Sequence, residues 1–251
     1  MPIHIEWSGQ GEPVLFVPGW NTTAATVRSW IPEDFFRQYR CGILEWPGVG
    51  ESQEDPLPSS LDQFLDQLDE ALPDRPVTLV GFCLGGVAAW AFAQRHPGSA
   101  RGSVMVESPL HFPLILAPLL VPGLGWAVLR LTQATPLFRW MVRRAILQSK
   151  APYPDGFLDS LFAFKAGSAI HYLRIFNAFS RTIGSDARAL PSERACWNLK
   201  GVFALKVLAP SLGSRHRVEA ILLPLEGAGH FPAVEAPAAC FQRIQGALTS
   251  T

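Results

Sequence analysis

The most informative segment of the chain is VTLVGFCLGGVAA, residues 77–89. It begins as a short apolar run typical of a buried strand and ends as an alanine-rich run typical of a helix. The pattern Gly-x-Cys-x-Gly-Gly joins the two runs and predicts a sharp turn with Cys83 at its tip. Gly81 and Gly85 are the positions at which a Cβ atom would collide with the neighbouring strand and helix. Because a helix is expected directly after Cys83, the partial positive charge of its N-terminus favours the thiolate form.

Segments typical of strands and helices alternate on both sides of this turn. The strands are expected at Ile3–Trp7, Val14–Val17, Gly42–Trp46, Val77–Gly81, Gly102–Glu107, Ala195–Leu199 and Val218–Leu225. The helices are expected within Asn21–Tyr39 and at Ser59–Leu72, Gly86–His96, Val202–Leu208 and Ala236–Leu248. Because parallel strands need helical crossovers, this order predicts an α/β fold: a mostly parallel sheet with helices on both faces.

The alternation stops in residues 109–189, which read as helical and irregular. Residues 108–129 contain no Asp, Glu, Lys or Arg, and residues 108–154 contain no acidic residue. Repeated prolines and glycines disfavour one continuous membrane-spanning helix, and they favour an apolar lid or a surface that rests on a membrane. We therefore expect an α/β core formed by residues 1–108 and 190–251, interrupted by a hydrophobic helical cap.

The composition excludes several classes of protein. The 251 residues include 21 Lys and Arg against 21 Asp and Glu, so no net charge draws the chain to nucleic acid or to acidic membranes. A hydrophobic content of 48% supplies ample material for a core and excludes disorder. The four cysteines form no CxxC pair, so neither a zinc site nor a disulfide framework is expected, and no cofactor is implied. The first residues lack a basic and apolar leader, which favours a cytoplasmic location.

Four motifs, in chain order, resemble those of the α/β-hydrolase superfamily. They are VPGW at residues 17–20, LEWPGVGES at 44–52, GFCLGG at 81–86 and GAGHFP at 227–232. The layout is similar to that of small capped esterases and thioesterases, such as pimeloyl-carrier-protein methyl esterases. The cysteine box resembles that of polyhydroxyalkanoate synthases, whose chains are considerably longer. The resemblance implies the α/β-hydrolase fold with a helical cap insertion.

The same resemblance implies roles for individual residues. Cys83 stands where most members of the superfamily have a serine nucleophile, and His230 stands at the position of the general base. The backbone N–H groups of Trp20 and Leu84 correspond to the oxyanion hole. One departure is Pro18, which replaces the histidine usual in the VPGW turn.

The carboxylate that orients the histidine is not where the superfamily usually has it. No Asp or Glu lies between Glu193 and Glu219. Glu107, at the end of the expected strand Gly102–Glu107, is the first candidate, and Asn198 is the second. A third possibility is that no such group is needed, because a Cys–His pair forms a thiolate–imidazolium pair without a third member.

Cysteine chemistry and the apolar cap together predict a class of substrate. Acyl exchange between a thioester and a thiol is nearly neutral in energy, so a cysteine nucleophile suits acyl transfer from a thioester or an ester. Many apolar cap residues are available to recognise an acyl chain by burial: Leu110, Phe112, Leu114, Ile115, Leu116, Leu119, Leu120, Val121, Leu124, Trp126, Val128, Leu129 and Leu131. Packing of the cap onto the core or onto a partner explains the same residues equally well.

Alternatives to this function stay open from the sequence alone. A basic cluster, Arg139, Arg143, Arg144 and Lys150, is most simply a solvated face, and it would also suit an acyl carrier protein, a coenzyme A phosphate or a lipid head group. The main alternative to an enzyme is a catalytically impaired homologue that binds an apolar ligand or a partner. A polymerising acyltransferase is a further alternative, which the short chain disfavours.

Overall fold

The computed structural model describes residues 3–109, 112–137, 140, 153, 157–186, 196–201, 221–225 and 228–249. The described strands are β1 (Ile5–Ser8), β2 (Glu12–Val17), β3 (Tyr39–Leu44), β4 (Val77–Phe82), β5 (Ala100–Val106), β6 (Cys196–Gly201) and β7 (Ile221–Leu225). The helices outside the cap are α1 (Ala24–Arg28), α2 (Glu33–Gln38), η1 (Gly50–Ser52), α3 (Leu61–Ala71), α4 (Leu84–Arg95), α10 (Pro232–Glu235) and α11 (Pro237–Leu248). The cap helices are η2 (Leu114–Leu120), α5 (Leu124–Ala134), α7 (Phe157–Ser160) and α8 (Ala166–Asp186).

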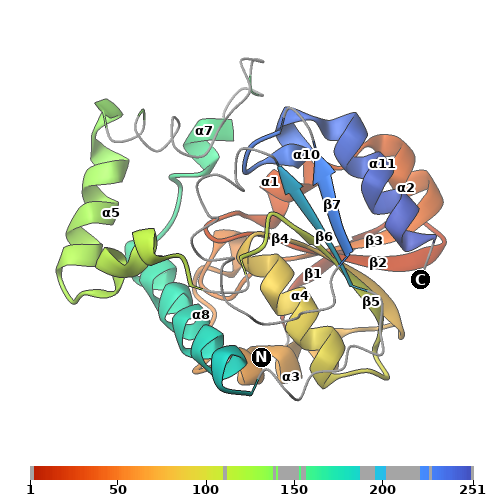
Figure 1. Cartoon of the computed structure of the whole chain (residues 1–251), viewed down its shortest axis with the longest axis horizontal. Coiled ribbons are helices and arrows are strands. Elements are labelled where there is room, and N and C mark those ends of the chain that lie inside the picture. The colour runs from red at the N-terminus through yellow and green to blue at the C-terminus, as the bar shows by residue number, and fades with distance from the viewer. Residues whose placement is uncertain are drawn as a thin grey trace.

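The described strands form one sheet in the order β1-β3-β2-β4-β5-β6-β7 (Figure 1). Strand β1 runs antiparallel to β3, and every other pairing is parallel. All six residues of β4 are buried, as expected for a central strand covered on both faces. The predicted fold class, a mostly parallel sheet with helices on both faces, is confirmed.

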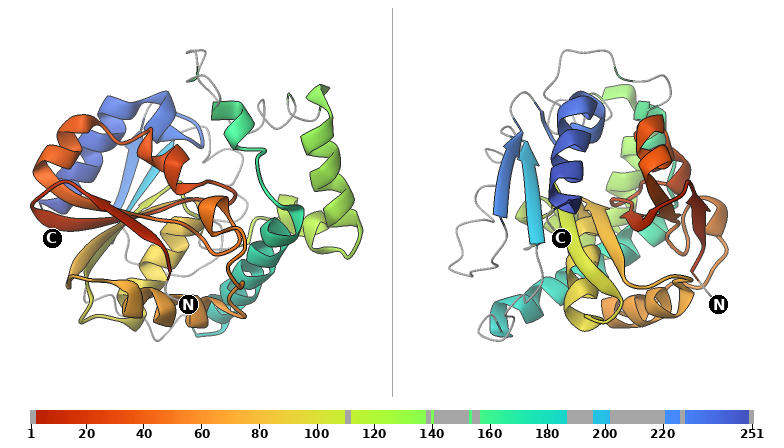
Figure 2. Two further views of the ribbon diagram at one scale, coloured as in Figure 1. Left: turned by 180° about the vertical axis from the view of Figure 1, so that it is seen from behind. Right: turned by 90° about the vertical axis from the view of Figure 1, so that its right-hand side faces the viewer.

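The alternation of side chains along β2 shows how the two layers of helices are held. Val14 and Phe16 face a cluster that contains side chains of α1, α2 and α11. Leu15 and Val17 face the opposite cluster, which contains side chains of α3 and α4. Because successive strand residues point to opposite faces, this short apolar run supplies both halves of the core. Figure 2 shows the helices on either side of the sheet.

The strand order brings three chain segments to one edge of the sheet. Strand β2 lies beside β4, and β4 lies beside β5, all in parallel. Their carboxyl ends therefore open at the same edge, which is where open α/β sheets bind ligands. Cys83 and Glu107 directly follow β4 and β5, and Trp20 is the third residue after β2.

The cap lies between β5 and β6 in the sequence and stands to one side of the sheet (Figures 1 and 2). Helix α8 attaches to the core through two aromatic side chains. Tyr172 Oη donates a hydrogen bond of 2.7 Å to the carbonyl oxygen of Pro47. Trp20 Nε1 donates one of 2.9 Å to the carbonyl oxygen of Ala169. The partition into a core of residues 1–108 and 190–251 and a cap stays a prediction.

Two other sequence predictions concern the cap and the segment after β6. Among the described helices, none is by itself long and apolar enough to cross a membrane. The pair η2 and α5 passes that test together, but the two helices are bent by 106°. The expected helix Val202–Leu208 and the basic cluster of Arg139, Arg143, Arg144 and Lys150 lie outside the described residues.

Candidate active site

Cys83 occupies a strained turn between β4 and α4. Its backbone angles are φ 49° and ψ −118°, a conformation that costs a residue with a side chain about 1–3 kcal/mol. The turn is held on both sides, because the Cys83 N–H donates to the carbonyl oxygen of Val106 at 2.8 Å and the Gly86 N–H donates to the Cys83 carbonyl oxygen at 3.1 Å. Strain that the neighbouring structure holds in place is typical of functional sites.

The glycines around Cys83 explain why the turn is this tight. A Cβ atom on Gly81 would overlap the carbonyl oxygen of Gly85, and one on Gly85 would overlap that of Pro18. A Cβ atom on Gly86 would overlap the Ser108 hydroxyl group, so this third glycine is also required by close packing. The helix can therefore begin directly behind Cys83, as the sequence predicts.

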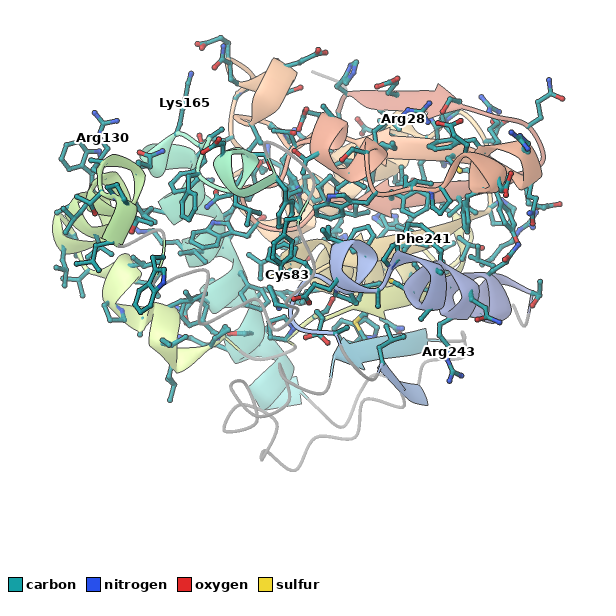
Figure 3. All side chains as sticks on the ribbon, turned by 90° about the horizontal axis from the view of Figure 1, so that it is seen from above. Arg28, Cys83, Arg130, Lys165, Phe241 and Arg243 are labelled. Atoms are coloured by element: carbon teal, nitrogen blue, oxygen red, sulfur yellow. The ribbon has the colours of Figure 1, made fainter. Side chains whose placement is uncertain are left out.

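His230 lies beside Cys83, in the segment that connects β7 to α10. Its Nδ1 is 3.8 Å from Glu107 Oε2, and its side chain is only 18% exposed. On the other side, the imidazole is hydrogen-bonded to the Cys83 side chain. The structure thus brings together the three residues that the sequence predicts for nucleophile, base and orienting acid. Figure 3 shows Cys83 where the cap helices meet the core.

The electrostatics of this group favour a charged imidazole. Burial by itself disfavours the charged form, but the Cys83 sulfur, by its charge and its hydrogen bond, and then Glu107 outweigh it. Together they raise the pKa of His230 to about 10. A raised histidine pKa beside a cysteine is what a thiolate–imidazolium pair would produce, and the protons of such a pair titrate together rather than singly.

The position of Glu107 follows from strand register. Val106 pairs with Phe82, so Glu107 and Cys83 leave β5 and β4 at the same level. Glu107 has a positive φ of 53° and a side chain that is 1% exposed. Asn198, the alternative orienting group, pairs with Met105 inside the sheet, one residue before the end of β5. Glu107 is therefore the candidate that the geometry favours.

A clamp around the histidine segment was not foreseen from the sequence. Glu235 accepts a hydrogen bond from the Gly229 N–H through Oε2 and one of 3.1 Å from Tyr153 Oη through Oε1. Phe231 packs edge-on against both His230 and Phe157, at ring-centroid distances of 5.2 and 5.3 Å. Residues of the cap thus fix the segment that carries His230. The sequence signal from which it could have been found is the glutamate five residues after the motif histidine.

The two predicted oxyanion donors flank the nucleophile. The Thr22 N–H donates to the Gly19 carbonyl oxygen at 3.1 Å, which closes a tight turn around Trp20. A Cβ atom on Gly19 would lie 3.3 Å from the Cys83 Cβ, so this turn abuts the nucleophile. Leu84 is the first residue of α4, where backbone N–H groups have no partner within the helix. The assignment of both N–H groups to an oxyanion hole stays a prediction.

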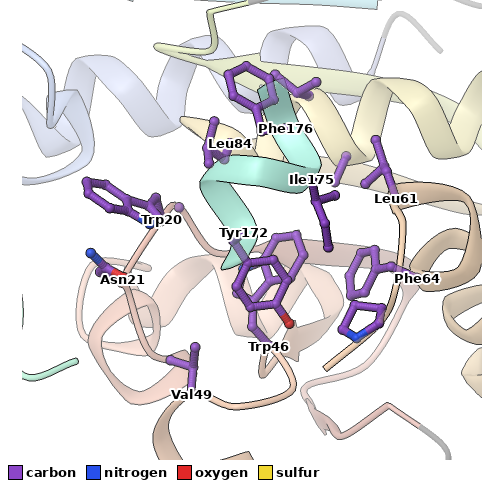
Figure 4. A pocket seen from close by; sticks show the side chains of 14 residues that line it. Trp20, Asn21, Trp46, Val49, Leu61, Phe64, Leu84, Tyr172, Ile175 and Phe176 are labelled. Atoms are coloured by element: carbon purple, nitrogen blue, oxygen red, sulfur yellow. The ribbon is translucent and has the colours of Figure 1, made fainter. Parts of the chain in front are cut away.

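A pocket that is partly open to solvent lies beside these donors (Figure 4). Its lining is almost entirely apolar: Gly19, Trp20, Asn21, Trp46, Val49, Pro58, Leu61, Phe64, Leu84, Val87, Ala88, Tyr172, Ile175 and Phe176. The polar atoms of its aromatic residues are already engaged. Trp46 Nε1 donates to the Pro18 carbonyl oxygen at 2.9 Å, and the Tyr172 and Trp20 groups donate to backbone carbonyls as described above. The pocket therefore offers burial rather than hydrogen bonds.

The cap contributes to this pocket through a helix that the sequence did not single out. None of the described residues among the thirteen apolar cap residues named above lines it. The cap residues that do so are Tyr172, Ile175 and Phe176, one face of α8. Residues of η2 and α5 either pack beneath α8, as Leu119 and Leu129 do, or lie exposed.

Cys41 and Cys240 do not add a second chemical site. Burial raises the pKa of Cys41 to about 12, and burial with the charge of Glu107 raises that of Cys240 to about 12. Both thiols are 0% exposed, so neither suits a nucleophile. Within the described part of the chain, no group of three His, Cys, Asp or Glu side chains is placed to hold a metal ion.

Comparison with known families agrees with this architecture. A family model described as the alpha/beta hydrolase fold matches residues 12–191, so the chain belongs to the α/β-hydrolase fold family. A solved structure, Cfl2 from Burkholderia cenocepacia, superposes with a TM-score of 0.77 over 97% of this chain and 92% of that one. Its sequence identity is 16%, so it shows the common fold alone.

The curated relatives have more specific names, but their alignments with this chain are shorter. A pimeloyl-[acyl-carrier protein] methyl ester esterase of Shewanella woodyi is 31% identical over 106 residues, which cover 42% of this chain and 40% of that protein. The enzyme of the same name from Edwardsiella ictaluri is 32% identical over 126 residues, 50% of this chain and 46% of that protein. In both cases the chain spans less than half the length of the relative.

Proposed function

We propose that this protein is an acyl-transfer enzyme in which Cys83 accepts an apolar acyl group from a thioester or an ester and passes it to water or another acceptor. The observation that carries the proposal is the alignment of Cys83, His230 and Glu107, with Cys83 on a strained turn. The relatives named as esterases support the same class of reaction. The likeness of the cysteine box to that of polyhydroxyalkanoate synthases supports thiol chemistry.

The first half of the reaction acylates the cysteine. The Cys83 thiolate attacks the acyl carbonyl carbon, and the carbonyl electron pair moves onto oxygen, where the Trp20 and Leu84 N–H groups would stabilise it. Each such donor is typically worth about 3 kcal/mol of barrier. The C–S or C–O bond of the substrate then breaks, and the leaving thiolate or alkoxide takes the proton held by His230. The product of this half is a thioester on Cys83.

The second half releases the acyl group. A water molecule, or an acceptor thiol or alcohol, gives its proton to His230 as its oxygen or sulfur attacks the thioester carbonyl. Cys83 departs as a thiolate beside the imidazolium, which restores the starting pair. Glu107 stabilises the positive charge on His230 and orients the ring throughout.

The apolar pocket defines the substrate side of the proposal. It begins at Trp20 and Leu84, next to Cys83, and extends along α8 to Ile175. Burying a methylene group is worth about 0.8 kcal/mol, so a chain that fills this pocket is selected by length. The lining offers no charged side chain, which favours an uncharged aliphatic acyl chain. A carrier protein or coenzyme A on the thiol side of the substrate is compatible with this arrangement.

The test is acylation by a short series of aliphatic acyl thioesters of N-acetylcysteamine, followed by intact mass spectrometry. We expect the wild-type protein to gain the mass of one acyl group and Cys83→Ala to gain none and to lose turnover. Cys240→Ala serves as the matched control, because Cys240 is buried and should leave both results unchanged.

Two results would overturn the proposal. The first is undiminished turnover by Cys83→Ala. The second is a wild-type protein that binds the acyl probe yet forms neither an acyl adduct nor product, which would support a catalytically impaired homologue that binds an apolar ligand.

A further inference from the structure

The outer face of the cap exposes an apolar surface that no described part of the chain covers. Among the residues that the structure describes, the eight large apolar side chains that are most exposed all lie between residues 114 and 140: Leu114, Ile115, Val121, Leu124, Trp126, Leu131, Leu137 and Trp140. Leu114 and Ile115 are 81% and 70% exposed. We call this set the outer cap face. Its confinement to one segment sets it apart from the scattered exposed leucines of an ordinary protein surface.

In helix α5, several outward positions are apolar, so the exposure is not limited to a single side chain. Gly125, Leu129 and Thr132 recur at helical spacing and are buried against the rest of the cap. The outward positions of the same helix include Leu124, Trp126 and Leu131, which are apolar. In α3, by contrast, exposed positions are occupied by polar residues such as Asp62, Gln63 and Glu70. Helix α5 is therefore apolar on both faces.

In the sequence, the charged Lys, Arg, Asp and Glu residues of the segment that carries this face have one sign. Residues 108–154 contain five basic residues and no acidic one. Arg130, which is described, lies on α5 with its guanidinium 5.5 Å from the centroid of the Trp126 ring. An arginine beside an exposed tryptophan provides a cation that can bind lipid phosphate groups and a ring suited to the membrane–water interface.

We propose that the outer cap face binds the surface of an anionic lipid bilayer. Leucine, isoleucine and tryptophan side chains would enter the interfacial region, while Arg130 would remain at the level of the phosphate groups. An acidic protein partner would match the charge of the segment, but it would leave most of the exposed apolar side chains without an apolar environment. The inference stands apart from the proposed function, because it concerns where the protein binds and not what it transforms.

The position of the candidate active site relative to this segment bears on how a membrane-bound protein would be oriented. Leu116, Leu119 and Leu120, on the inner side of η2, belong to the cluster that contains Leu84 and touches Cys83. Through these residues, the segment that carries the outer cap face also packs against the surroundings of Cys83. A protein seated on a bilayer by this face would hold its candidate site next to a lipid phase.

The test is co-flotation of the full chain with vesicles of phosphatidylcholine alone or mixed with phosphatidylglycerol. We expect the wild type to float with the mixed vesicles, and less so when salt is raised. The double variant Leu114→Gln/Ile115→Gln should bind them about tenfold more weakly, because two exposed apolar side chains are lost. Arg130→Gln should weaken binding about fivefold. Arg243→Gln, an exposed arginine on α11, is the matched control and should bind like the wild type.

Turnover of a water-soluble acyl thioester is measured on the same variants and should not change, so a loss of flotation is separable from a loss of activity. Three results would overturn the proposal. They are no flotation with mixed vesicles, equal flotation of the double variant, and a concentration-dependent dimer or a complex with a purified acidic carrier protein that forms through this face in place of vesicle binding.

Discussion

The two sides of the Cys83 turn differ in kind. On one side lie buried polar groups, His230 and Glu107, held by strand register and by the Glu235 clamp. On the other side lies a pocket whose aromatic N–H and O–H groups donate to backbone carbonyls. In the proposed function, the polar side would set the rate of bond breaking and the apolar side would select the acyl chain. Substitutions on the two sides should therefore affect different kinetic constants.

The largest effect is expected from His230→Ala on the polar side. The variant lacks the imidazole that is proposed to keep Cys83 ionised and to transfer the proton, so kcat should fall about a thousandfold. The matched control is His171→Ala, because His171 contacts the Pro58 carbonyl oxygen from α8 and does not line the pocket. Steady-state kinetics on an aliphatic acyl thioester measures both. Equal activity of the two variants would contradict the role of His230.

The next effect separates the candidates for the orienting group. Glu107→Gln keeps the shape of the side chain but removes its charge, and kcat should fall about tenfold to a hundredfold. The loss is smaller than in serine triads because the Cys83–His230 ion pair persists without Glu107. Asn198→Ala should leave kcat nearly unchanged. The reverse pattern would assign the role to Asn198, and unchanged rates in both would mean that no third group acts.

The apolar side is tested by filling the pocket. Ile175→Trp adds volume at the lining of the pocket, so long acyl chains should lose their burial while short ones fit. We expect the ratio of kcat/KM for a decanoyl over a butanoyl thioester to fall about tenfold, an amount that matches two buried methylene groups. Ala178→Trp, exposed on the same helix, is the control. A uniform loss on both substrates would break the division between the two sides.

The smallest effect on activity is expected from another buried carboxyl group, that of Glu45. It accepts a hydrogen bond from the Ala24 N–H at 3.1 Å, and burial raises its pKa to about 7. Because the folded state holds this proton more tightly than the unfolded chain, stability falls as pH rises through the interval from about 4.5 to about 7. Glu45→Gln should remove that decline, worth up to about 3 kcal/mol, with turnover unchanged. Urea unfolding across this pH range measures it, and identical pH profiles for the two proteins would exclude the effect.

Local motifs made the polar side predictable. The glycines around Cys83 indicate a tight turn, because a Cβ atom at any of these positions would overlap a neighbouring atom. His230 was recognisable from the GAGHFP motif. Glu107 could be predicted although the acid was missing from its usual segment, because residues at the carboxyl ends of neighbouring parallel strands meet at one edge of the sheet.

The apolar side was not predictable, for a physical reason. Helix α8 has apolar residues around much of its circumference, and only its docking onto Trp46 and Trp20 determines that Tyr172, Ile175 and Phe176 face the pocket. The more conspicuous apolar run of η2 and α5 drew attention in the sequence, yet its described residues do not line the pocket. The sequence shows that the cap is rich in apolar residues, but only tertiary packing determines which of them line the pocket, which pack together and which stay exposed.

The central claim, a cysteine thiolate paired with a charged imidazole, is tested most directly by the pH dependence of alkylation of Cys83 with iodoacetamide. Since the raised pKa of His230 keeps its proton to about 10, a thiolate paired with this imidazolium should react at a nearly constant rate between about pH 6 and pH 9. In His230→Ala the rate should instead rise with pH through the ordinary thiol range. A wild-type rate that rises in the same way as that of His230→Ala would contradict the account.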